Sequence, residues 1–363
     1  MRVLLIRLRL IGDVVFTTPV IRALRRCRPD AHLTYLVEPA AAPVVQHNPH
    51  LDDVIVAPRT RGLTRLRSDV ALGLRLRRER FDVVLDLHGG PRASWLTRLS
   101  GAPRRIGYDV QARRWIYTDV VDRPRELRPR HSVENQWDIL QPLLGALAPP
   151  ERTRDAVEMQ PAPDAETAID AWLRREGLAA HHTLVLIHVS AGNRFRRWPL
   201  ESFAELSHSL AAAGRNRRII LTSGPSEAEA AQEVVDQVRA RHGASPEAVR
   251  TCGHTSLDQL RSLIDRAQVF IGGDSGPLHV AATTRTPIVG LYGPTLPVRS
   301  APWRDPQVFS AAVDVGDLPC RPCAQRVCQP GDFRCLTRIT VDAVAAAAER
   351  ALERVPAPVG QAD

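Results

Sequence analysis

A short apolar segment that runs straight into a glycine turn and a helix start constrains the fold of this chain most. Residues 267–271, Ala-Gln-Val-Phe-Ile, are typical of a buried strand, and glycines at 272–273 permit a tight turn close to a ligand. Ser275 or Gly276 is suited to cap a helix with Pro277 in its first turn. This order predicts a strand–turn–helix unit whose free helix amides offer an anion site.

Two side chains at this turn can carry chemistry. Asp274 does not suit a phosphate, but a carboxylate can accept a hydrogen bond from a sugar or ribose hydroxyl. His279 falls in the first turn of the expected helix and points back toward the same place. The alternative is an ordinary turn of turn-forming residues, with a solvated Asp and His.

The N-terminus predicts a second unit of the same kind. Residues 2–8 form an apolar run typical of a buried parallel strand. Thr18 can cap the following helix with Pro19 at its first position, which leaves Gly12 and Asp13 in the loop between strand and helix. Ligands of open α/β sheets bind at such loops. The alternative for Asp13 is a local turn contact.

Strand and helix patterns alternate along the chain and predict two parallel-sheet domains, which 363 residues are enough to build. The proline-rich stretch 145–163 reads as a linker. The expected strands are 2–8, 32–37, 53–56, 81–87, 183–188, 218–222, 268–272 and 287–292. The expected divisions are an N-terminal acceptor-side Rossmann-like domain over 1–150, a C-terminal nucleotide-sugar-binding Rossmann-like domain over 165–340, a helix over 341–355 and a disordered tail over 356–363.

A set of short motifs, in one order over nearly the whole chain, resembles the ADP-heptose:lipopolysaccharide heptosyltransferases of glycosyltransferase family nine. The resemblance implies a GT-B fold, in which two Rossmann-like parallel-sheet domains face each other across a cleft. It also implies inverting transfer of heptose from an ADP-sugar to the inner core of lipopolysaccharide. The motifs are Gly12-Asp13, Thr17-Thr18-Pro19, Asp86-Leu87-His88-Gly89-Gly90, Arg105-Ile106-Gly107-Tyr108-Asp109, His131-Ser132-Val133-Glu134, Arg196-Arg197-Trp198-Pro199, Gly224-Pro225-Ser226-Glu227, the run from Gly272 to His279, and Tyr292-Gly293-Pro294-Thr295.

The resemblance also implies roles for individual residues. Asp13 would be the catalytic base that takes the proton of the acceptor hydroxyl. Glu227 would hold the adenosine ribose, although an early-helix Glu needs no ligand. The donor-binding candidates are Ser190, Arg196, Glu227, Asp274, Ser275, Gly276 and His279. The acceptor-side candidates are Gly12, Thr17, His88 and Arg105, of which the loop His and the surface Arg can equally be without function.

Other family positions have plain structural explanations. His131 and Glu134 open an expected helix and can be its capping groups. Trp198 fits a core anchor beside a helix start better than a ligand contact. Residues 190–192 read Ser-Ala-Gly where some relatives carry hydroxyl residues, so a side-chain contact to phosphate depends on Ser190 alone.

The charge of the chain is carried by arginine alone. The net charge is +9, and all 49 basic residues are Arg, a replacement complete enough to indicate a compositional bias. Arg196 stands where the family has Lys; it keeps the charge but offers a planar fork. The arginines are dispersed and aromatic residues are 5%, so nucleic acid is not an expected partner. An anionic membrane surface, touched transiently, fits the charge.

No Asp-x-Asp pair occurs in the sequence, so we expect metal-independent transfer with no cofactor. Four cysteines, Cys320, Cys323, Cys328 and Cys335, have spacing that suits a structural zinc, with free thiols or a disulfide as the alternatives. No apolar stretch reaches membrane-spanning length and the start lacks a signal-peptide layout. We therefore expect a cytoplasmic monomer that acts peripherally at the inner face of the cytoplasmic membrane.

The sequence thus favours a heptosyltransferase that uses ADP-heptose, with lipid A–Kdo or a heptosylated core as acceptor. One alternative is a sibling GT-B transferase with another nucleotide sugar or acceptor. Another is a non-catalytic protein that binds a nucleotide sugar or nucleic acid. A base at Asp13, in the domain opposite the Gly272–His279 run, favours the enzyme, because a binding protein needs no base.

Overall fold

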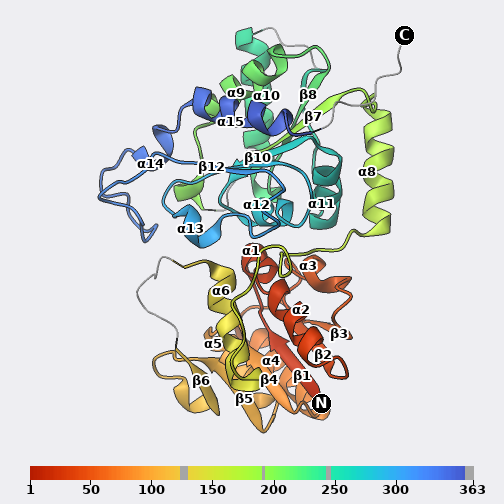
Figure 1. Cartoon of the computed structure of the whole chain (residues 1–363), viewed down its shortest axis with the longest axis vertical. Coiled ribbons are helices and arrows are strands. Elements are labelled where there is room, and N and C mark those ends of the chain that lie inside the picture. The colour runs from red at the N-terminus through yellow and green to blue at the C-terminus, as the bar shows by residue number, and fades with distance from the viewer. Residues whose placement is uncertain (123–129, 190–192, 243–246, 356–363) are drawn as a thin grey trace. The chain divides into compact units, whose positions relative to one another are not determined.

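The computed structural model describes residues 1–122, 130–189, 193–242 and 247–355, and the chain divides into two compact units, Met1–Gln160 and Pro161–Asp363. In each unit, helices cover both faces of a six-stranded sheet (Figure 1). The predicted tail, 356–363, lies outside the described residues.

The first unit alternates strands with helices along the chain. Its strands are β1 (Arg2–Ile6), β2 (His32–Val37), β3 (Asp53–Val56), β4 (Val83–Asp86), β5 (Arg104–Tyr108) and β6 (Asp119–Val121). Its helices are α1 (Ile11–Val15), α2 (Thr18–Cys27), α3 (Pro43–Gln46), α4 (Gly62–Arg78), α5 (Pro91–Leu99), α6 (Ser132–Trp137) and α7 (Gln141–Leu144), with 3₁₀ turns η1 (Arg114–Ile116) and η2 (Asp138–Leu140).

The second unit repeats this alternation. Its strands are β7 (Thr183–His188), β8 (Arg217–Thr222), β9 (Val249–Thr251), β10 (Val269–Gly273), β11 (Ile288–Leu291) and β12 (Ser310–Val313). Its helices are α8 (Pro163–Arg175), α9 (Leu200–Ala212), α10 (Ala228–His242), α11 (Leu257–Arg266), α12 (Gly276–Ala281), α13 (Pro297–Ser300), α14 (Arg334–Thr337) and α15 (Val341–Leu352), with 3₁₀ turns η3 (Arg194–Arg196) and η4 (Pro225–Glu227).

Both sheets are parallel and share one strand order. The first runs β3-β2-β1-β4-β5-β6 and the second β12-β11-β10-β7-β8-β9, which is the doubly wound order 3-2-1-4-5-6 in each case. The order reverses between β1 and β4, where Ile6 is level with Asp86, and between β7 and β10, where His188 is level with Gly272. The prediction of two Rossmann-like parallel sheets is confirmed.

Buried apolar side chains on both faces of each sheet hold the units together. In the first unit, Leu4 and Ile6 of β1 pack with Leu72 and Leu76 of α4. In the second, the strands pack with α9, α10 and the alanine-rich α15, whose Ala347 is fully buried. Near-continuous apolar runs such as those of β1 and β7 are required where helices cover both faces.

The sequence did not predict four strands: β5, β6, β9 and β12. They lie away from the centre of their sheets, with β6, β9 and β12 at the edges. Their sequences are short or polar; β5 begins with two arginines and β9 has three residues. Because an outer strand is only partly covered, it does not need the apolar run that marks the central strands.

The connection after β1 also differs from the prediction. The segment expected to be a loop forms the short helix α1, and Asp13 lies in its first turn. Leu10, with a φ of 66°, turns the chain directly into that helix. The next helix, α2, starts at Thr18 with Thr17 as its N-cap residue, one position earlier than predicted. Apolar periodicity cannot detect a helix of five residues.

The segment 151–160, which precedes the predicted second domain, makes its contacts with the first unit. Arg22 forms an ion pair with Glu158, and the backbone N–H of Glu158 donates to Thr18 Oγ1 over 3.0 Å. Arg26 pairs with the buried carboxylate of Asp155 at 3.1 Å. These contacts tie the segment 151–160 to the body of the first unit.

Candidate functional site

In the second unit, the turn that joins β10 to α12 carries the central charged group. Asp274 is 2% exposed, and its Oδ2 accepts a hydrogen bond from Thr295 Oγ1. His279 Nε2 lies 3.4 Å from Asp274 Oδ1, as its position in the first turn of the helix predicted. Ser275 is the N-cap residue of α12, and Pro277 falls in the first turn, also as predicted.

Arg196 of η3 reaches the same turn from the loop that follows β7. Its Nη1 donates to the backbone carbonyl of Asp274 over 2.8 Å and lies 3.4 Å from Asp274 Oδ2. Its Nε donates to Gln325 Oε1 over 2.9 Å. Two donors of the guanidinium fork therefore fix the cation beside the start of α12.

Burial raises the pKa of the Asp274 carboxyl group, but the hydrogen bond and charge of His279, the charge of Arg196 and the hydrogen bond of Thr295 outweigh it and lower that pKa to about 2. The carboxylate is therefore ionised at any pH at which the protein works. It is occupied by its own neighbours, and its clearest effect is to hold the side chains of Arg196 and His279 in place.

Small residues allow this close approach. A Cβ atom at Gly273 would lie 3.1 Å from the backbone oxygen of Arg196, closer than a side chain normally packs. A Cβ atom at Gly272 would lie 3.3 Å from His188 Cβ. The hydroxyl oxygen of Ser275 is buried and has no hydrogen-bond partner among the residues that the structure describes. A polar ligand at this turn can supply one.

Glu227 is the last residue of η4, the turn that follows β8. It is 9% exposed, and its Oε1 forms an ion pair of 2.7 Å with Arg197. Arg197 and Arg196 thus bind two different carboxylates, those of Glu227 and Asp274. The remaining donor candidate, Ser190, lies outside the described residues.

His188 is the last residue of β7 and lies level with Gly272 of β10. Its ring is buried, its Nδ1 lies 2.9 Å from Thr222 Oγ1, and burial lowers its pKa to about 4. The ring is therefore neutral at physiological pH. In the sequence, His188 marks only the end of a strand, because a single His in an apolar run is usually a core residue.

In the first unit, Asp13 pairs with an arginine that the sequence did not single out. Arg7, which follows β1 directly, is 5% exposed and forms an ion pair with Asp13. Its Nη1 also donates to the backbone carbonyl of Leu87 over 2.6 Å. The side chain of Asp13 is 31% exposed, so the carboxylate is oriented by a buried cation and still reaches solvent. In a chain of 49 arginines, no single Arg stood out.

Asp86, at the end of β4, is the buried acid next to this pair. It accepts hydrogen bonds from Tyr117 Oη over 2.6 Å and from the backbone N–H groups of His88 and Gly89 over 2.9 and 2.8 Å. Burial raises its pKa, while these donors and the charge of Arg7 oppose the rise. Asp86 therefore shapes the loop that carries His88, beside the helix α1 that carries Asp13.

The structure brings three of the four acceptor-side candidates to this edge, with different exposure. Gly12 is buried in α1, and His88 is half-buried in the loop after β4. Thr17 is fully buried, and its Oγ1 is bonded to Val14 O and Tyr35 Oη, both over 2.7 Å. A side chain engaged in this way supports α1 and α2 from within.

Arg105 is placed differently. It is the second residue of β5, level with Val84, two positions before the level of Asp86. Its Nε donates to Ile116 O over 2.7 Å and its Nη1 to Ala102 O over 2.6 Å. Two backbone carbonyls therefore hold the guanidinium, and Ala102 precedes the strand. The structure does not bring Arg105 together with Asp13.

His131, Glu134 and Trp198 have the structural roles that the sequence predicted. His131 Nδ1 accepts from the backbone N–H of Val133, and Glu134 accepts from that of His131, which makes a capping box for α6. Trp198 is 2% exposed and donates from Nε1 to Ile339 O over 3.1 Å.

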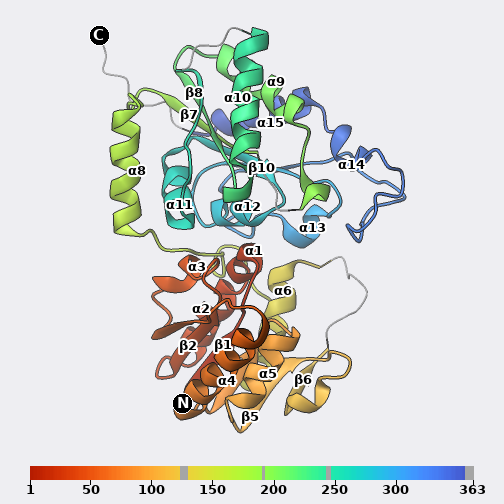
Figure 2. The same ribbon diagram turned by 180° about the vertical axis from the view of Figure 1, so that it is seen from behind.

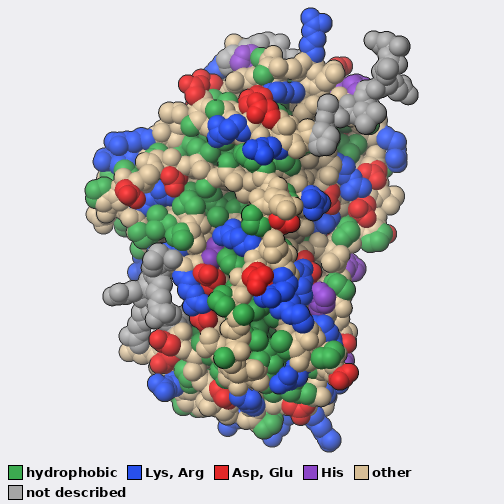
Figure 3. All heavy atoms as spheres, viewed as in Figure 1, with side chains coloured by type: hydrophobic (Ala, Val, Ile, Leu, Met, Phe, Trp, Pro, Cys, Tyr) green, Lys and Arg blue, Asp and Glu red, His purple; other side chains and the backbone are tan. Residues whose placement is uncertain are grey.

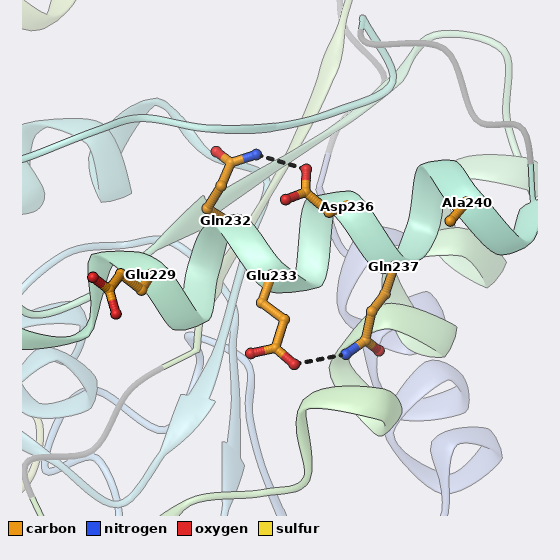
Figure 4. A pocket seen from close by; sticks show the side chains of 6 residues that line it. All are labelled: Glu229, Gln232, Glu233, Asp236, Gln237 and Ala240. Carbon is orange, nitrogen blue, oxygen red and sulfur yellow. Dashed lines mark hydrogen bonds between the residues drawn. The ribbon is translucent and has the colours of Figure 1, made fainter.

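Two other surface features, a hollow along α10 and the exposed arginines, do not form a comparable group of interacting side chains. A hollow of about 480 Å³ lies along α10, and four of its polar lining residues pair within the helix, Gln232 with Asp236 and Gln237 with Glu233. On the face drawn in Figure 3, arginine side chains are dispersed among Asp and Glu. Figure 4 shows that the labelled lining residues all come from this one helix.

The four C-terminal cysteines are free thiols, half-buried, in the segment between β12 and α15. Burial raises the pKa of Cys335, and the charges of Cys320 and Cys328 raise it further. Within the described part of the chain, no three His, Cys, Asp or Glu side chains stand together as a group able to hold a metal ion.

None of the helices in that part has the length and apolar character needed to cross a bilayer.

Comparison with known proteins points to one family. The sequence model of glycosyltransferase family 9 (heptosyltransferase) matches residues 70–332. The chain is 28% identical over 325 residues to lipopolysaccharide heptosyltransferase 3 of Escherichia coli, covering 86% of this chain and 90% of that protein.

Solved structures agree on the fold, which is GT-B. The glycosyl transferase family 9 protein of Veillonella parvula has a TM-score of 0.84 at 24% identity, over 98% of both chains. The E. coli heptosyltransferase WaaC, solved with ADP-2-deoxy-2-fluoro heptose, has a TM-score of 0.67 at 20% identity, over 96% of this chain and 99% of that one.

Proposed function

The chain belongs to glycosyltransferase family 9, the heptosyltransferases, and on that premise we propose that it moves heptose from ADP-L-glycero-D-manno-heptose to the inner core of lipopolysaccharide, with inversion. The acceptor is lipid A–Kdo or a core that already carries heptose. The first unit supplies the base and the acceptor contacts, and the second binds the donor.

The observation that carries the proposal is the fixed cation beside α12. Arg196 is held by Asp274 and Gln325 at the turn after β10, next to the helix start at Ser275. A guanidinium and backbone amides at this switch point are suited to the two phosphates of ADP. Glu227, at the end of η4 after strand β8, is proposed to accept hydrogen bonds from the ribose.

In the proposed reaction, the Asp13 carboxylate removes the proton of the acceptor hydroxyl as its oxygen attacks the anomeric carbon. The new C–O bond forms while the bond from the anomeric carbon to the β-phosphate oxygen breaks, and ADP leaves with the electron pair. Arg196 and the amides of Ser275 and Gly276 stabilise the charge that develops on the diphosphate. Arg7 acts as a positioning residue that keeps the Asp13 carboxylate in place.

We further propose that the protein works without a metal ion, as a cytoplasmic monomer that is peripheral at the inner face of the cytoplasmic membrane. The sequence has no Asp-x-Asp pair to bind a cation, and the donor turn carries Arg196 and His279. A lipid-anchored acceptor requires the enzyme to work at a membrane surface. Nucleic acid is not a proposed partner.

A donor screen separates this proposal from its rivals. Calorimetric titration with ADP-heptose, ADP-glucose and UDP-sugars identifies the nucleotide sugar. Tight binding of a UDP-sugar, with ADP-heptose ignored, would establish the sibling transferase. Binding of ADP-heptose without transfer to either a Kdo-terminated or a heptose-terminated acceptor would establish a binding protein.

The experiment that tests the mechanism is Asp13→Asn, which keeps the size of the side chain and removes the base. We expect single-turnover transfer to slow by about 10²–10⁴-fold. Donor affinity should be unchanged, since the donor contacts are assigned to the other unit. The matched control is Asp30→Asn, at an exposed turn position of the same unit. Transfer at the wild-type rate would reject Asp13 as the base.

A loss of structure has to be distinguished from a loss of the base. The melting temperature of Asp13→Asn should stay within a few degrees of wild type, because Asp13 is partly exposed. An unfolded variant would mean that the Arg7–Asp13 pair is needed for the fold of α1. Arg7→Lys, which retains the charge, should preserve more transfer than Arg7→Met.

A further inference from the structure

One side of α4 carries apolar residues that nothing in the described part of the chain covers. Leu66, Val70 and Leu74 are 63%, 48% and 53% exposed. They are spaced four residues apart and so form one row along the helix. The helix meets its own core with a different side, through Leu72 and Leu76, which are 6% and 0% exposed. The exposed row therefore does not contribute to the hydrophobic core of the unit.

The row continues onto α5 and the turn η1. Leu99 of α5 packs against Gly73 of α4. A Cβ atom at Gly73 would lie 2.8 Å from Leu99 Cβ, so the glycine permits this contact. One turn earlier, Trp95 is 52% exposed and meets Trp115 of η1 edge-on, with ring centroids 5.9 Å apart. Trp115 is itself 61% exposed.

We call the set the α4–α5 apolar surface; Figure 2 shows α4 and α5 in the view from behind. Its members are Leu66, Val70, Leu74, Trp95, Leu99 and Trp115.

Arginines border this surface. Arg67, Arg77 and Arg78 are exposed and lie three or four positions from Val70 or Leu74, on adjoining parts of the helix. Arg98, also exposed, lies beside Leu99 on α5. The one acidic residue of α4, Asp69, is taken up by ion pairs with Arg92 at 2.6 Å and Arg65 at 3.6 Å. The border is therefore strongly positive.

We infer that the α4–α5 apolar surface docks the first unit onto an anionic phospholipid bilayer. Exposed leucines with tryptophans, ringed by arginines, match what an interfacial helix presents to lipid: apolar groups enter the headgroup boundary, tryptophans sit at its level, and cations meet anionic headgroups. A second copy of the chain is the less suitable occupant, because a two-fold contact would bring this border of arginines against itself.

The test is sedimentation of the full chain with vesicles. Binding to vesicles of phosphatidylglycerol and phosphatidylcholine should exceed binding to pure phosphatidylcholine at least tenfold, and should weaken as salt is raised. The double variant Leu66→Gln with Leu74→Gln should lose at least tenfold in affinity. Arg67→Gln with Arg78→Gln should lose about fivefold for each charge removed, which corresponds to about 1 kcal/mol for each.

Matched controls come from exposed positions of the second unit. Val298→Gln with Val327→Gln removes two apolar side chains that are 49% and 65% exposed, away from this surface. Arg174→Gln with Arg239→Gln removes the same charge from exposed helix positions. Both controls should bind vesicles like wild type, and all variants should melt like wild type, because the altered side chains are exposed.

Three outcomes would overturn the inference. They are equal binding to neutral and anionic vesicles, variants of the surface that bind like the controls, and a dimer in sedimentation equilibrium that the leucine variants dissociate.

Vesicle binding needs no sugar transfer, so it can succeed where the proposed function fails. If the proposed function holds, the surface variants should also transfer normally to a delipidated, water-soluble acceptor.

Discussion

Arg196 donates from Nη1 to the backbone carbonyl of Asp274 over 2.8 Å, while the same nitrogen lies 3.4 Å from the carboxylate of Asp274. The two residues are 78 positions apart in the chain and belong to two motifs that stand apart in the sequence. Their contact makes one site of the loop after β7 and the turn after β10. An acid at the second motif therefore governs where the cation of the first one points.

Replacing that acid should weaken donor binding through Arg196. Asp274→Asn keeps the shape of the side chain but leaves Arg196 without its buried counter-charge, and removing one partner of a buried ion pair costs about 3–5 kcal/mol. We expect a melting temperature lower by several degrees and a donor affinity reduced about tenfold, measured by calorimetry. Thr295→Val, which removes only one hydrogen bond to Asp274, is the graded control. Wild-type values for both quantities would contradict this role.

Charge at position 196 should matter more than the shape of the side chain. Arg196→Ala should weaken ADP-sugar binding by about 1.5–3 kcal/mol, the contribution of a charge-assisted contact, and Arg196→Lys should largely restore it. The lysine cannot reproduce both the contact to Asp274 and the contact to Gln325, so its melting temperature should stay below wild type. Donor titration and thermal melting check the two statements. An Arg196→Ala variant that binds the ADP-sugar with wild-type affinity would show that Arg196 does not contact the diphosphate.

His188 should make the second unit sensitive to acid. The pKa of His188 is about 4 in the folded protein, against 6.5 for a solvated histidine. Between pH 6.5 and 4, the histidine is therefore protonated in the unfolded chain and neutral in the folded chain. The free energy of unfolding should therefore fall as the pH goes from 6.5 to 4, by about 3 kcal/mol for this group. His188→Asn, which cannot be protonated there, should flatten the decline in urea titrations.

A control variant and the separate pH range of Asp274 show whether His188 causes the decline. His47→Asn, at an exposed position, should leave the pH dependence as in wild type. Asp274 acts in another window: its pKa is lowered to about 2, so its contribution is complete above about pH 4 and is lost between pH 4 and 2. A decline between pH 6.5 and 4 that is the same in His188→Asn as in wild type would mean that other groups cause it.

Chelation should leave sugar transfer intact. Because cationic groups at the donor turn are proposed to take the place of a bridging metal, we expect turnover in excess EDTA to match that in buffer. Loss of activity that magnesium restores would refute metal-independence. Slow loss together with a lower melting temperature would instead reveal a structural zinc at Cys320, Cys323, Cys328 and Cys335, which metal analysis of the purified protein can detect.

The sequence was sufficient for the central strands and for the turns after β4 and β10, because both depend on local signals, but it missed the helix α1 that follows β1. Apolar runs mark β1, β4, β7 and β10, and Gly or Pro marks the turns that follow β4 and β10. The outer strands were missed because their positions come from pairing with neighbours. The contacts of Arg7 with Asp13 and of Arg197 with Glu227 join residues whose proximity depends on three-dimensional packing.

The α4–α5 apolar surface was missed for another reason. The arginine-rich pattern of 75–79 is typical of a solvated helix face, and the charge does lie in solvent. Periodicity did not reveal that α4 has a second apolar side, because Leu66, Val70 and Leu74 look like core positions in the sequence. Only the fold shows which of the two rows faces the sheet.

The shared strand order has a practical consequence for handling this protein. Every crossover in a doubly wound sheet carries the chain back to the same starting edge, so the loops entering the strands sit opposite those that carry the chemistry. The turn at 213–216, which enters β8, is of this kind and is largely exposed. A fluorophore or an affinity handle attached there would lie at the opposite end of the strands from the proposed donor contacts.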